Sequence, residues 1–249
     1  MKCNRRNLPP YGKKETLMSF KTELHCHSKD ISPCSLQDVD GIVEKYTSGG
    51  YASLVLTNHA GEYIFNVVIP DGTWKSKVDY YFDAAEKLRD AAGDRLTIID
   101  GMELRFNESI NDYLVFGVTR EKFYDIPDVF SYSPGRFHDY AKENDMLFIQ
   151  AHPMRFGMTL TSPDCLDGYE IFNGHQGQRS HNDIAKAWAE HFNRHSLILT
   201  SGSDSHELGL PTSGGIVTDE KICSSDELLS VLRSGSYSLI RTPLGDAEY

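Results

Sequence analysis

Two histidines separated by one residue, His25 and His27, follow a short stretch of alternating polar and apolar residues in TELHCHS. In an extended strand, residues i and i+2 point to the same face, so both imidazoles can bind one metal ion. A single pair of this kind is weak evidence, because isolated histidines are commonly hydrogen-bonded core or surface residues. The remainder of the sequence has to decide between a metal site and chance.

Further residues with metal-binding side chains occupy similar places along the chain. Each lies at or just past the C-terminal end of an apolar segment: His59, Glu103, His152, Asp204 and His206. One such residue alone has an ordinary explanation as a hydrogen-bonded polar group, but chance does not readily place all of them there. With the first pair they offer imidazole and carboxylate ligands, which suit zinc, manganese and iron. This set exceeds the need of one catalytic ion, which keeps a position open for water, so we expect two or three divalent ions.

Strand-like and helix-like segments alternate along the chain. Strands are expected at 19–25, 51–57, 95–104, 113–118, 146–152, 166–173 and 196–204, and helices at 35–50, 74–93, 134–145, 180–195 and 225–235, before 236–242 closes the chain. Several strands are continuous apolar runs, which is typical of a parallel sheet covered by helices. In a chain of 249 residues this alternation favours a (β/α) barrel in one domain over an open doubly wound sheet.

A barrel would bring the metal-binding residues together, because the carboxyl ends of its strands converge on one face, where active sites are built.

Local sequence signals support the helices that are expected between the strands. Ser35 is the expected N-cap of the first helix, Gly49 and Gly50 end it, and Pro134 lies near the start of the third helix. No glycine-rich phosphate-binding motif opens any helix, which disfavours the common nucleotide-binding folds.

Composition narrows the classes of function. The formal net charge of −11 and the pI of about 5.3 disfavour stable binding to nucleic acids or to anionic membranes, which need a basic surface. The five cysteines are irregularly spaced and do not suggest a disulfide framework, so we expect a cytoplasmic location. We expect neither a secretory signal nor a membrane helix, because no sufficiently long apolar run occurs.

The order of the motifs resembles that of a known family. ELHCHS, LTNHA, GMELRF, QAHP, YEIFNG and SGSDSH follow one another as in the PHP family (polymerase and histidinol phosphatase domains), over about residues 20–242. The combination of an early HxH with a late GSDxH is specific. The resemblance implies a distorted TIM-like (β/α)7 barrel that holds up to three divalent ions and hydrolyses phosphoesters. Residues 18–249 would then form one domain, preceded by an N-terminal extension at 1–17.

The resemblance also implies how the ligands are shared among the ions. A first site would take His25, His27, Glu103 and Asp204; Glu103 would bridge to a second site with His152; and His59 and His206 would belong to a third.

The chain departs from the family pattern in two places. Family members often have an Asp or His five to six residues after the HxH pair, where this chain has Ser32 and Pro33. Asp30 and Cys34 are the nearest substitutes. Family members also often have a histidine leading the strand after the glutamate, and Asp112 is the nearest ligand-type residue here. The second and third sites therefore depend on which of these residues completes the shell.

The expected reaction is attack of a metal-bridged hydroxide on phosphorus, because two ions lower the pKa of a shared water. Arg155 lies three residues after His152 and is a candidate for a bidentate contact to phosphate, with a surface salt bridge as the alternative. His175 is a candidate to protonate the leaving alkoxide. Asn173 either orients the substrate or closes a turn.

Other residues with chemical side chains have simpler explanations. Three histidines lie in helical patterns and are expected on the surface: His138, His191 and His195. His181 belongs either to a surface loop or to the site. The segment 61–75, with Tyr63, Phe65 and Trp74, forms either an apolar wall or lid at the site or a packing contact with the neighbouring helix.

A phosphatase or phosphodiesterase acting on a small phosphorylated molecule is the favoured function, because the chain has no separate binding domain and no basic stretch for a polymer. A nuclease or a phosphoprotein phosphatase of the same family is an alternative. A catalytically degenerate metal-binding module is another, given the departures at 32–33. An amidohydrolase on a related barrel ranks below these, since it would normally lack the GSDSH arrangement. No feature of the sequence sets an oligomeric state.

Overall fold

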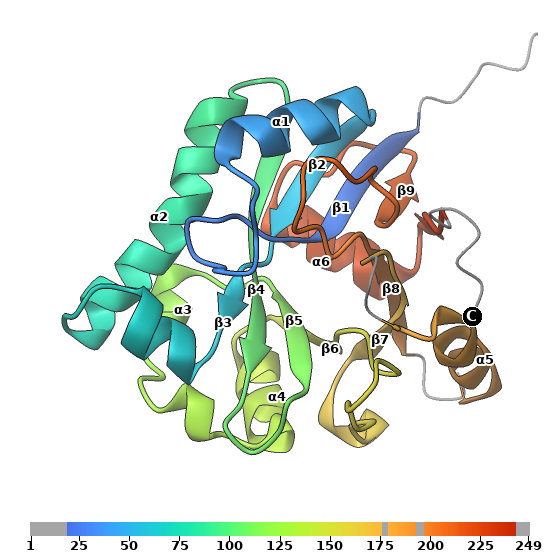
Figure 1. Ribbon diagram of the computed structural model, residues 1–249. Helices are drawn as coiled ribbons and strands as arrows, with labels where there is room; N and C mark the ends of the chain where they lie inside the picture. Colours follow the sequence, from blue (N-terminus) through green and yellow to red (C-terminus); the bar gives the residue numbers. More distant parts are fainter. Residues whose placement is uncertain (1–18, 176–178, 193–196, 243–249) are drawn as a thin grey trace, which may run out of the picture.

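Seven strands form the central sheet in the order β1-β2-β4-β5-β6-β7-β8, and β9 and β10 continue it beyond β1 (Figure 1). The computed structural model describes residues 19–175, 179–192 and 197–242. The central strands are β1 (Phe20–Cys26), β2 (Tyr51–Leu56), β4 (Thr97–Arg105), β5 (Asp112–Phe116), β6 (Leu147–Gln150), β7 (Gly168–Asn173) and β8 (Ile198–Gly202). The short strands are β3 (His59–Ala60), which pairs with β4, β9 (Ile216–Thr218) and β10 (Ser238–Leu239).

The far edge of the sheet returns to β1, so the sheet nearly closes into a barrel. Just beyond β8, Ser205 forms a parallel bridge with Cys26. The His27 amide donates to the Ser205 carbonyl at 3.2 Å. This arrangement confirms the distorted, seven-stranded (β/α) barrel in a single domain.

Among the seven central strands, one runs against the others, which is part of the distortion. β5 is antiparallel to both β4 and β6, whereas β1, β2, β4, β6, β7 and β8 pair in parallel along the sheet. Only residues 106–111 join β4 to β5, and a connection this short makes a hairpin, since parallel strands need a crossover of a dozen or more residues. The expectation of a parallel sheet is wrong at this strand and at β9, which is antiparallel to β1.

The helices lie around the strands (Figure 1). They are α1 (Val39–Ser48), α2 (Trp74–Ala92), α3 (Arg120–Tyr124), α4 (Pro134–Glu143), α5 (Asn182–Phe192) and α6 (Ser225–Ser234), with a π-helix at Ile64–Val68 and 3-10 turns at Val129–Ser131 and Pro163–Cys165. The sequence predicted all the longer helices but not α3 or the π-helix. The expected extension at 1–17 and the end of the helix predicted at 180–195 lie outside the described residues.

The start of α1 differs from the expected one. Asp38 is the N-cap, and its Oδ1 accepts a hydrogen bond from the Gly41 amide at 2.9 Å. Ser35 instead lies in the preceding loop, where its hydroxyl donates to the His27 carbonyl at 3.1 Å. The loop after β1 is thus longer than predicted, and it folds back onto the strand end that carries the histidine pair.

Apolar side chains fill the space between sheet and helices. One buried cluster combines residues of β1, β2, β4, β5 and β6 with Leu228, Leu229 and Leu232 of α6, so α6 packs directly against the sheet. A larger cluster includes residues of α1, α2 and α4. None of the helices in the described ranges is both long enough and apolar enough to cross a lipid bilayer.

The Asp38 cap gives a direct test of the start of α1. Replacing Asp38 with Ala removes the acceptor for the Gly41 amide, and we expect the free energy of unfolding to fall by about 1 kcal/mol. Asp38→Asn keeps a side-chain oxygen that caps equally well and should remain close to the wild type. Urea unfolding followed by circular dichroism measures both. Equal losses in the two variants would assign the effect to the exposed ion pair of Asp38 with Lys29 instead.

Candidate metal centre

The structure brings together all of the residues predicted to bind metal. They come from the C-terminal ends of different strands, or from the residues just beyond them. Within the described ranges, sets of possible ligand atoms lie within 4.8 Å of one another in four groups: His27, His59 and His206; His25, His27 and Glu103; His25, His152 and Asp204; and His59, Glu103 and Asp112. The groups overlap, so they form one continuous cluster.

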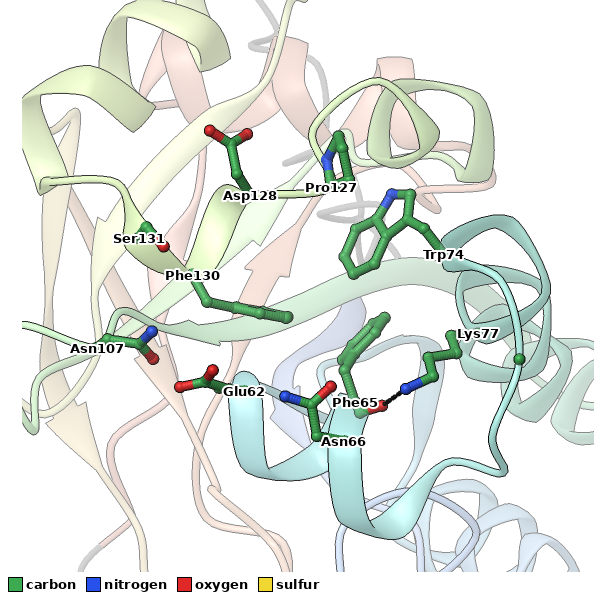
Figure 2. A pocket seen from close by; sticks show the side chains of 11 residues that line it. Glu62, Phe65, Asn66, Trp74, Lys77, Asn107, Pro127, Asp128, Phe130 and Ser131 are labelled. Atoms are coloured by element: carbon green, nitrogen blue, oxygen red, sulfur yellow. Dashed lines mark hydrogen bonds between the residues drawn. The ribbon is translucent and has the colours of Figure 1, made fainter.

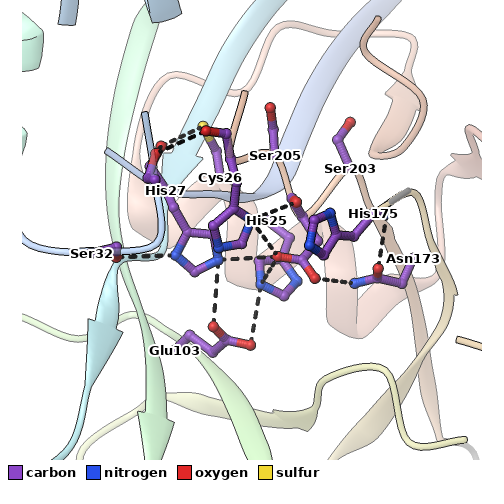
Figure 3. Close-up of polar contacts among 12 residues, drawn as sticks. His25, Cys26, His27, Ser32, Glu103, Asn173, His175, Ser203 and Ser205 are labelled. Atoms are coloured by element: carbon purple, nitrogen blue, oxygen red, sulfur yellow. Dashed lines mark hydrogen bonds and ion pairs between the residues drawn. The ribbon is translucent and has the colours of Figure 1, made fainter. Parts of the chain in front are cut away.

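The histidine pair at the end of β1 faces two carboxylates (Figure 3). His25 Nε2 lies 3.3 Å from Glu103 Oε1 and 3.5 Å from Asp204 Oδ1. His27 Nε2 lies 3.4 Å from Glu103 Oε2 and 3.3 Å from the same Asp204 oxygen. All these side chains are buried, so the polar atoms meet in a space from which solvent is largely excluded.

Glu103 occupies the centre of the cluster. Its Oε1 lies 3.0 Å from His152 Nε2, and its Oε2 lies 2.6 Å from His59 Nδ1. The pairing of β3 with β4 sets the second contact, because it places His59 directly opposite Glu103. The two carboxylate oxygens therefore face different sets of imidazoles.

His206 closes the cluster on the side of His27 and His59. Its ring stacks on that of His27, with centroids 4.3 Å apart, and lies 5.9 Å from that of His59. His206 Nδ1 also lies 3.4 Å from Asp204 Oδ1. These three imidazoles make a nitrogen-rich region next to the carboxylates.

A cation fits this arrangement, because buried nitrogen atoms converge without hydrogen-bond partners. Among the described residues, nothing hydrogen-bonds to Nε2 of His25 or of His27, although each atom lies close to carboxylate oxygens. An unpaired buried polar group costs roughly 1–3 kcal/mol. A divalent ion coordinated by these nitrogens would remove that cost.

The protonation states of two acids and one histidine suit metal binding. Burial disfavours the charged forms of His25 and His59, but the neighbouring carboxylates outweigh it and raise the pKa of both imidazoles well above the usual value, so these two would release a proton when they bind an ion. Burial favours the neutral form of Glu103, but the nearby His59 and His25 outweigh it and hold the pKa of this carboxyl well below its usual value. Burial also favours the neutral form of Asp204, but His25 and His27 outweigh it and hold the pKa of this carboxyl well below its usual value. Burial, together with His206 and His59, lowers the pKa of His27 well below its usual value. The two acids are therefore charged at neutral pH, and His27 has a free lone pair.

Two residues of the cluster have strained backbones. His152 has a φ of +30° and Asp204 a φ of +48°, in the left-handed region that non-glycine residues seldom adopt. Such conformations cost of the order of 1–3 kcal/mol and concentrate at functional sites. The fold therefore sacrifices stability to direct these two side chains into the cluster.

Glu170 in β7 is a functional residue that the sequence reasoning missed. Its Oε1 accepts a hydrogen bond from His25 Nδ1 at 2.9 Å, which leaves the other ring nitrogen of His25 facing the cluster. Its Oε2 accepts from the His152 amide and from Asn173 Nδ2, both at 2.9 Å. Carboxylates behind ligand histidines fix the ring orientation and tautomer. An acid inside the apolar strand GYEIFN was the signal that could have revealed it.

Arg155 is neither a surface residue nor free. Its side chain is 13% exposed, and Nη2 donates to Asp204 Oδ2 at 2.6 Å and to Asn173 Oδ1 at 3.0 Å. The alternative of a surface salt bridge is therefore wrong, because the ion pair is part of the cluster. Asn173 closes a turn, one of the two roles expected for it, because its Oδ1 accepts from the amide two residues on. It also links Arg155, Asp204 and Glu170.

His175 lies over the opposite side of His206. The two rings are stacked with centroids 4.9 Å apart, and the His175 amide donates to Asn173 Oδ1 at 3.1 Å. Burial lowers the pKa of His175. The residue thus stands at the edge of the cluster and is partly exposed.

The remaining histidines lie away from the cluster. His138 was expected on the surface, and this is wrong: it is buried against β6, and its Nε2 lies 3.3 Å from Asp167 Oδ1. His191 is exposed, as predicted. The His181 carbonyl accepts a hydrogen bond from the Ala185 amide at the start of α5. His195 lies outside the described residues.

A pocket of about 510 Å³ opens beside the cluster and includes three of its side chains. It is lined by Pro33, Cys34, His59, Ala60, Gly61, Glu62, Tyr63, Ile64, Glu103, Arg105, Phe106, Asn107, Ser109 and Asp112. The volume falls within the range of small-molecule sites. Apolar and polar groups share its wall, and His59, Glu103 and Asp112 connect it to the cluster.

The segment 61–75 provides both a wall of a pocket and packing contacts, the two alternatives considered for it. Phe65 and Trp74 pack on each other, with ring centroids 5.1 Å apart, and line a smaller pocket of about 240 Å³ (Figure 2). Tyr63 is 63% exposed and forms part of the wall of the larger pocket. Most of the segment is therefore packing, and of the three aromatic residues only Tyr63 lines the larger pocket beside the cluster.

Three solved structures show which proteins share this architecture. A two-domain protein from Bacteroides vulgatus, containing a predicted PHP-like metal-dependent phosphoesterase, has 17% identity and a TM-score of 0.62, with 97% of this chain and 70% of that chain covered. This chain has the fold of the PHP-like phosphoesterases. PsfC from Pseudomonas syringae has 14% identity and a TM-score of 0.64, over 90% and 92% of the two chains. The lesion-specific endonuclease PfuEndoQ from Pyrococcus furiosus has 15% identity and a TM-score of 0.59, over 89% of this chain.

The resemblance to the PHP family seen in the motifs is thus confirmed at the level of the fold. The chain spans 58% of the length of PfuEndoQ, so that endonuclease contains a large part with no counterpart here. No model of a known protein family matches the sequence, and no curated protein matches it significantly. Function must therefore be argued from the site itself.

The role of Glu170 can be tested by a single-atom change. In the wild type, the two Glu170 oxygens accept hydrogen bonds from His25 and from the His152 amide. In Glu170→Gln, an NH2 group replaces one of these oxygens, so one hydrogen-bond donor would face another donor. We expect metal affinity to fall about 10- to 100-fold, as for other groups behind ligand histidines. Competition with a chromogenic chelator measures this, and Glu143→Gln, at an exposed site on α4, is the control. Unchanged affinity in Glu170→Gln would contradict the assignment.

Proposed function

We propose that this protein hydrolyses phosphoester bonds of small molecules, with two or three divalent metal ions bound among the strand-end residues. The observation that carries the proposal is the position of Glu103. Its Oε1 faces His25 and His152, whereas its Oε2 faces His27 and His59. A buried carboxylate held between two sets of imidazoles in this way is suited to bridge two ions.

The donor set fits zinc, manganese or iron, since it consists of imidazole nitrogens and carboxylate oxygens. Ions bound there would act as Lewis acids that activate water and offset the charge of the phosphoryl group. The protein's own contribution is to hold the ligands in place and to supply the groups that bind and protonate the substrate.

Arg155 is the cation that the chain offers to a phosphate. Its Nη2 already donates to Asp204 and Asn173. Its Nε is buried and, among the described residues, has no hydrogen-bond partner. A phosphate oxygen would satisfy this donor, so we expect Arg155 to bind the substrate and to stabilise charge on the transferred phosphoryl group.

His175 is the proposed acid for the leaving group. It lies at the edge of the cluster over His206 and is partly accessible, unlike the buried His25 and His27. Burial lowers the pKa of His175, which makes its imidazolium form a stronger acid. Protonation of the leaving oxygen matters most where the leaving group is a poor one.

The pocket supports a small molecule rather than a polymer. Among the side chains that line it, Glu62, Glu103 and Asp112 are acidic, and Arg105 is paired with Asp112 through two hydrogen bonds of 2.7 and 2.6 Å. A nucleic-acid backbone needs an excess of cations along its path, which this wall does not offer. The formal net charge of −11 likewise disfavours binding of a nucleic-acid backbone.

Cleavage of a nucleic-acid phosphodiester is the second candidate function. It is favoured by the shared fold with PfuEndoQ, a lesion-specific endonuclease. A panel that contains p-nitrophenyl phosphate, bis(p-nitrophenyl) phosphate and a single-stranded oligonucleotide separates the two. Turnover of the oligonucleotide alone would favour the nuclease.

Metal dependence is the principal test of the proposed function. Protein purified without a histidine tag, stripped and then reloaded with manganese, zinc or iron, should hydrolyse p-nitrophenyl phosphate and lose this activity on chelation. Asp204→Asn should reduce kcat/KM by more than the roughly 100-fold typical of groups behind the ligands. Asp40→Asn, at an exposed site on α1, is the matched control. Absence of turnover on every phosphoester in the panel, with metal bound, would contradict the proposal.

The role of His175 predicts a dependence on the leaving group. His175→Ala should lower kcat roughly 100-fold or more for alkyl phosphates, which need protonation, and far less for p-nitrophenyl phosphate. His181→Ala serves as the control, because His181 lies at the start of α5 and outside the metal groups. An equal loss on both classes of substrate would indicate a structural role for His175.

Tyr63 tests whether the larger pocket holds the organic part of the substrate. Tyr63→Ala should raise KM for aryl phosphates about two- to tenfold, as expected for an aromatic contact of roughly 0.5–1.5 kcal/mol, and leave kcat unchanged. Val67, on the same segment, is equally exposed but lines neither pocket, so Val67→Ala is the control. If the two variants behave alike in steady-state kinetics, the substrate lies elsewhere.

A further inference from the structure

The segment that carries Asp204 and His206 lies beyond the regular pairing of the sheet. β8 ends at Gly202, and Ser205 then forms an isolated bridge with Cys26 of β1. Asp204 also has a left-handed backbone, which is strained and persists only where surrounding contacts hold it. The positions of the two ligand side chains therefore depend on contacts from other parts of the chain.

Three consecutive carbonyl groups of this segment accept hydrogen bonds from the loop after β1 and from α1. The pairs are the Ser205 carbonyl with Gln37 Nε2 at 2.7 Å, the His206 carbonyl with the Leu36 amide at 2.8 Å, and the Glu207 carbonyl with Lys45 Nζ at 2.6 Å. The backbone next to Asp204 is thus held at three successive residues by one neighbouring region.

Gln37 joins this segment to the histidine pair. Its side chain is fully buried, and Nε2 donates both to the Ser205 carbonyl at 2.7 Å and to the His27 carbonyl at 2.9 Å. His27 is itself a candidate ligand, and Ser205 lies between two others in the sequence. One side-chain amide therefore connects two segments that bring ligands from opposite edges of the sheet.

Lys45 determines which way this amide points. Its Nζ donates to Gln37 Oε1 at 3.2 Å and to Ser205 Oγ at 2.6 Å, and the Ser205 hydroxyl donates to the same Gln37 oxygen at 2.9 Å. An ammonium group has only donors, so the amide must turn its oxygen toward Lys45. Its NH2 group is then directed at the two carbonyls, which can only accept.

We propose that Gln37, oriented by Lys45, is a positioning residue of the metal centre, which holds Asp204 and His206 at the separation from His27 that ion binding requires. The inference rests on the metal centre of the proposed function. Gln37 and Lys45 contact the backbone of the ligand-bearing segments rather than the ligand atoms, so they act through position alone. Groups behind metal ligands set metal affinity in this way.

Gln37→Glu tests the role with little change of shape. It replaces the NH2 group with an oxygen that would face the carbonyls of His27 and Ser205, so the two segments should move apart. We expect the affinity for cobalt(II), measured by competition with a chromogenic chelator, to fall about 10- to 100-fold. The visible absorption bands of the cobalt-saturated protein should also change, because they report the coordination geometry of the ion.

Ser53→Ala is the control for a loss of stability without a loss of position. Ser53 is buried near the start of β2, where its hydroxyl donates to the Ile222 carbonyl, and it belongs to none of the ligand groups. Urea unfolding of the metal-free protein should show a lower stability for this variant. Its cobalt affinity and cobalt spectrum should remain those of the wild type.

Lys45→Met is a second variant that places no new charge in the interior. It releases the Glu207 carbonyl and one side of the Gln37 amide, so cobalt affinity should fall in the same direction. This variant decides the question if Gln37→Glu does not fold. Lys29→Met removes an exposed lysine from the loop after β1 and should keep the wild-type affinity.

The outcomes separate this inference from the function on which it rests. Wild-type cobalt affinity and spectrum in folded Gln37→Glu and Lys45→Met would overturn the positioning role and leave the phosphoesterase proposal intact. An equal loss of affinity in Ser53→Ala would also overturn it, since affinity would then follow stability. A change in Gln37→Glu without one in Lys45→Met would overturn the part assigned to Lys45. No metal bound by the wild type would overturn both this inference and the proposed function.

Discussion

The buried carboxylate of Glu103 is the group on which the rest of the site depends. It is 1% exposed, and a charge removed from water to this extent is tolerated only when other groups compensate it. The imidazoles of His25, His27, His59 and His152 surround it, and they arrive from separate parts of the chain. The fold therefore has to bring the ends of several strands to one point, which a nearly closed barrel does.

Several local features serve this convergence. The backbone of β8 comes close to β1 at Gly202, where a Cβ atom would lie 2.3 Å from His25 Cβ, so only glycine permits this approach. Glu170 then holds His25 from behind. The left-handed backbones of His152 and Asp204 turn these side chains inward just after their strands end. Stability is thereby traded for a preorganised set of ligands, as is common at functional sites.

The sequence contained enough information to predict the barrel and the residues of the cluster. Apolar runs that end in His, Glu or Asp are visible without a structure, because strand ends of a barrel share one face. The acid inside the apolar strand GYEIFN marks Glu170 as unusual, but its contacts with His25 and the His152 amide depend on partners distant in sequence. The burial of His138 was not predictable for the same reason. The same is true of Asp112, whose identity suggests a ligand but whose pairing with Arg105 appears only in three dimensions. The antiparallel β5 could have been inferred from its short connection to β4.

The most direct test of the central claim is a crystal structure of protein loaded with zinc or manganese, with anomalous data collected at the absorption edge of each metal. The account predicts at least two anomalous peaks, one on each side of the Glu103 carboxylate, with His25, His27 and Asp204 around one of them. A single peak remote from Glu103, or none at full metal occupancy in solution, would contradict a multinuclear centre bridged by this residue.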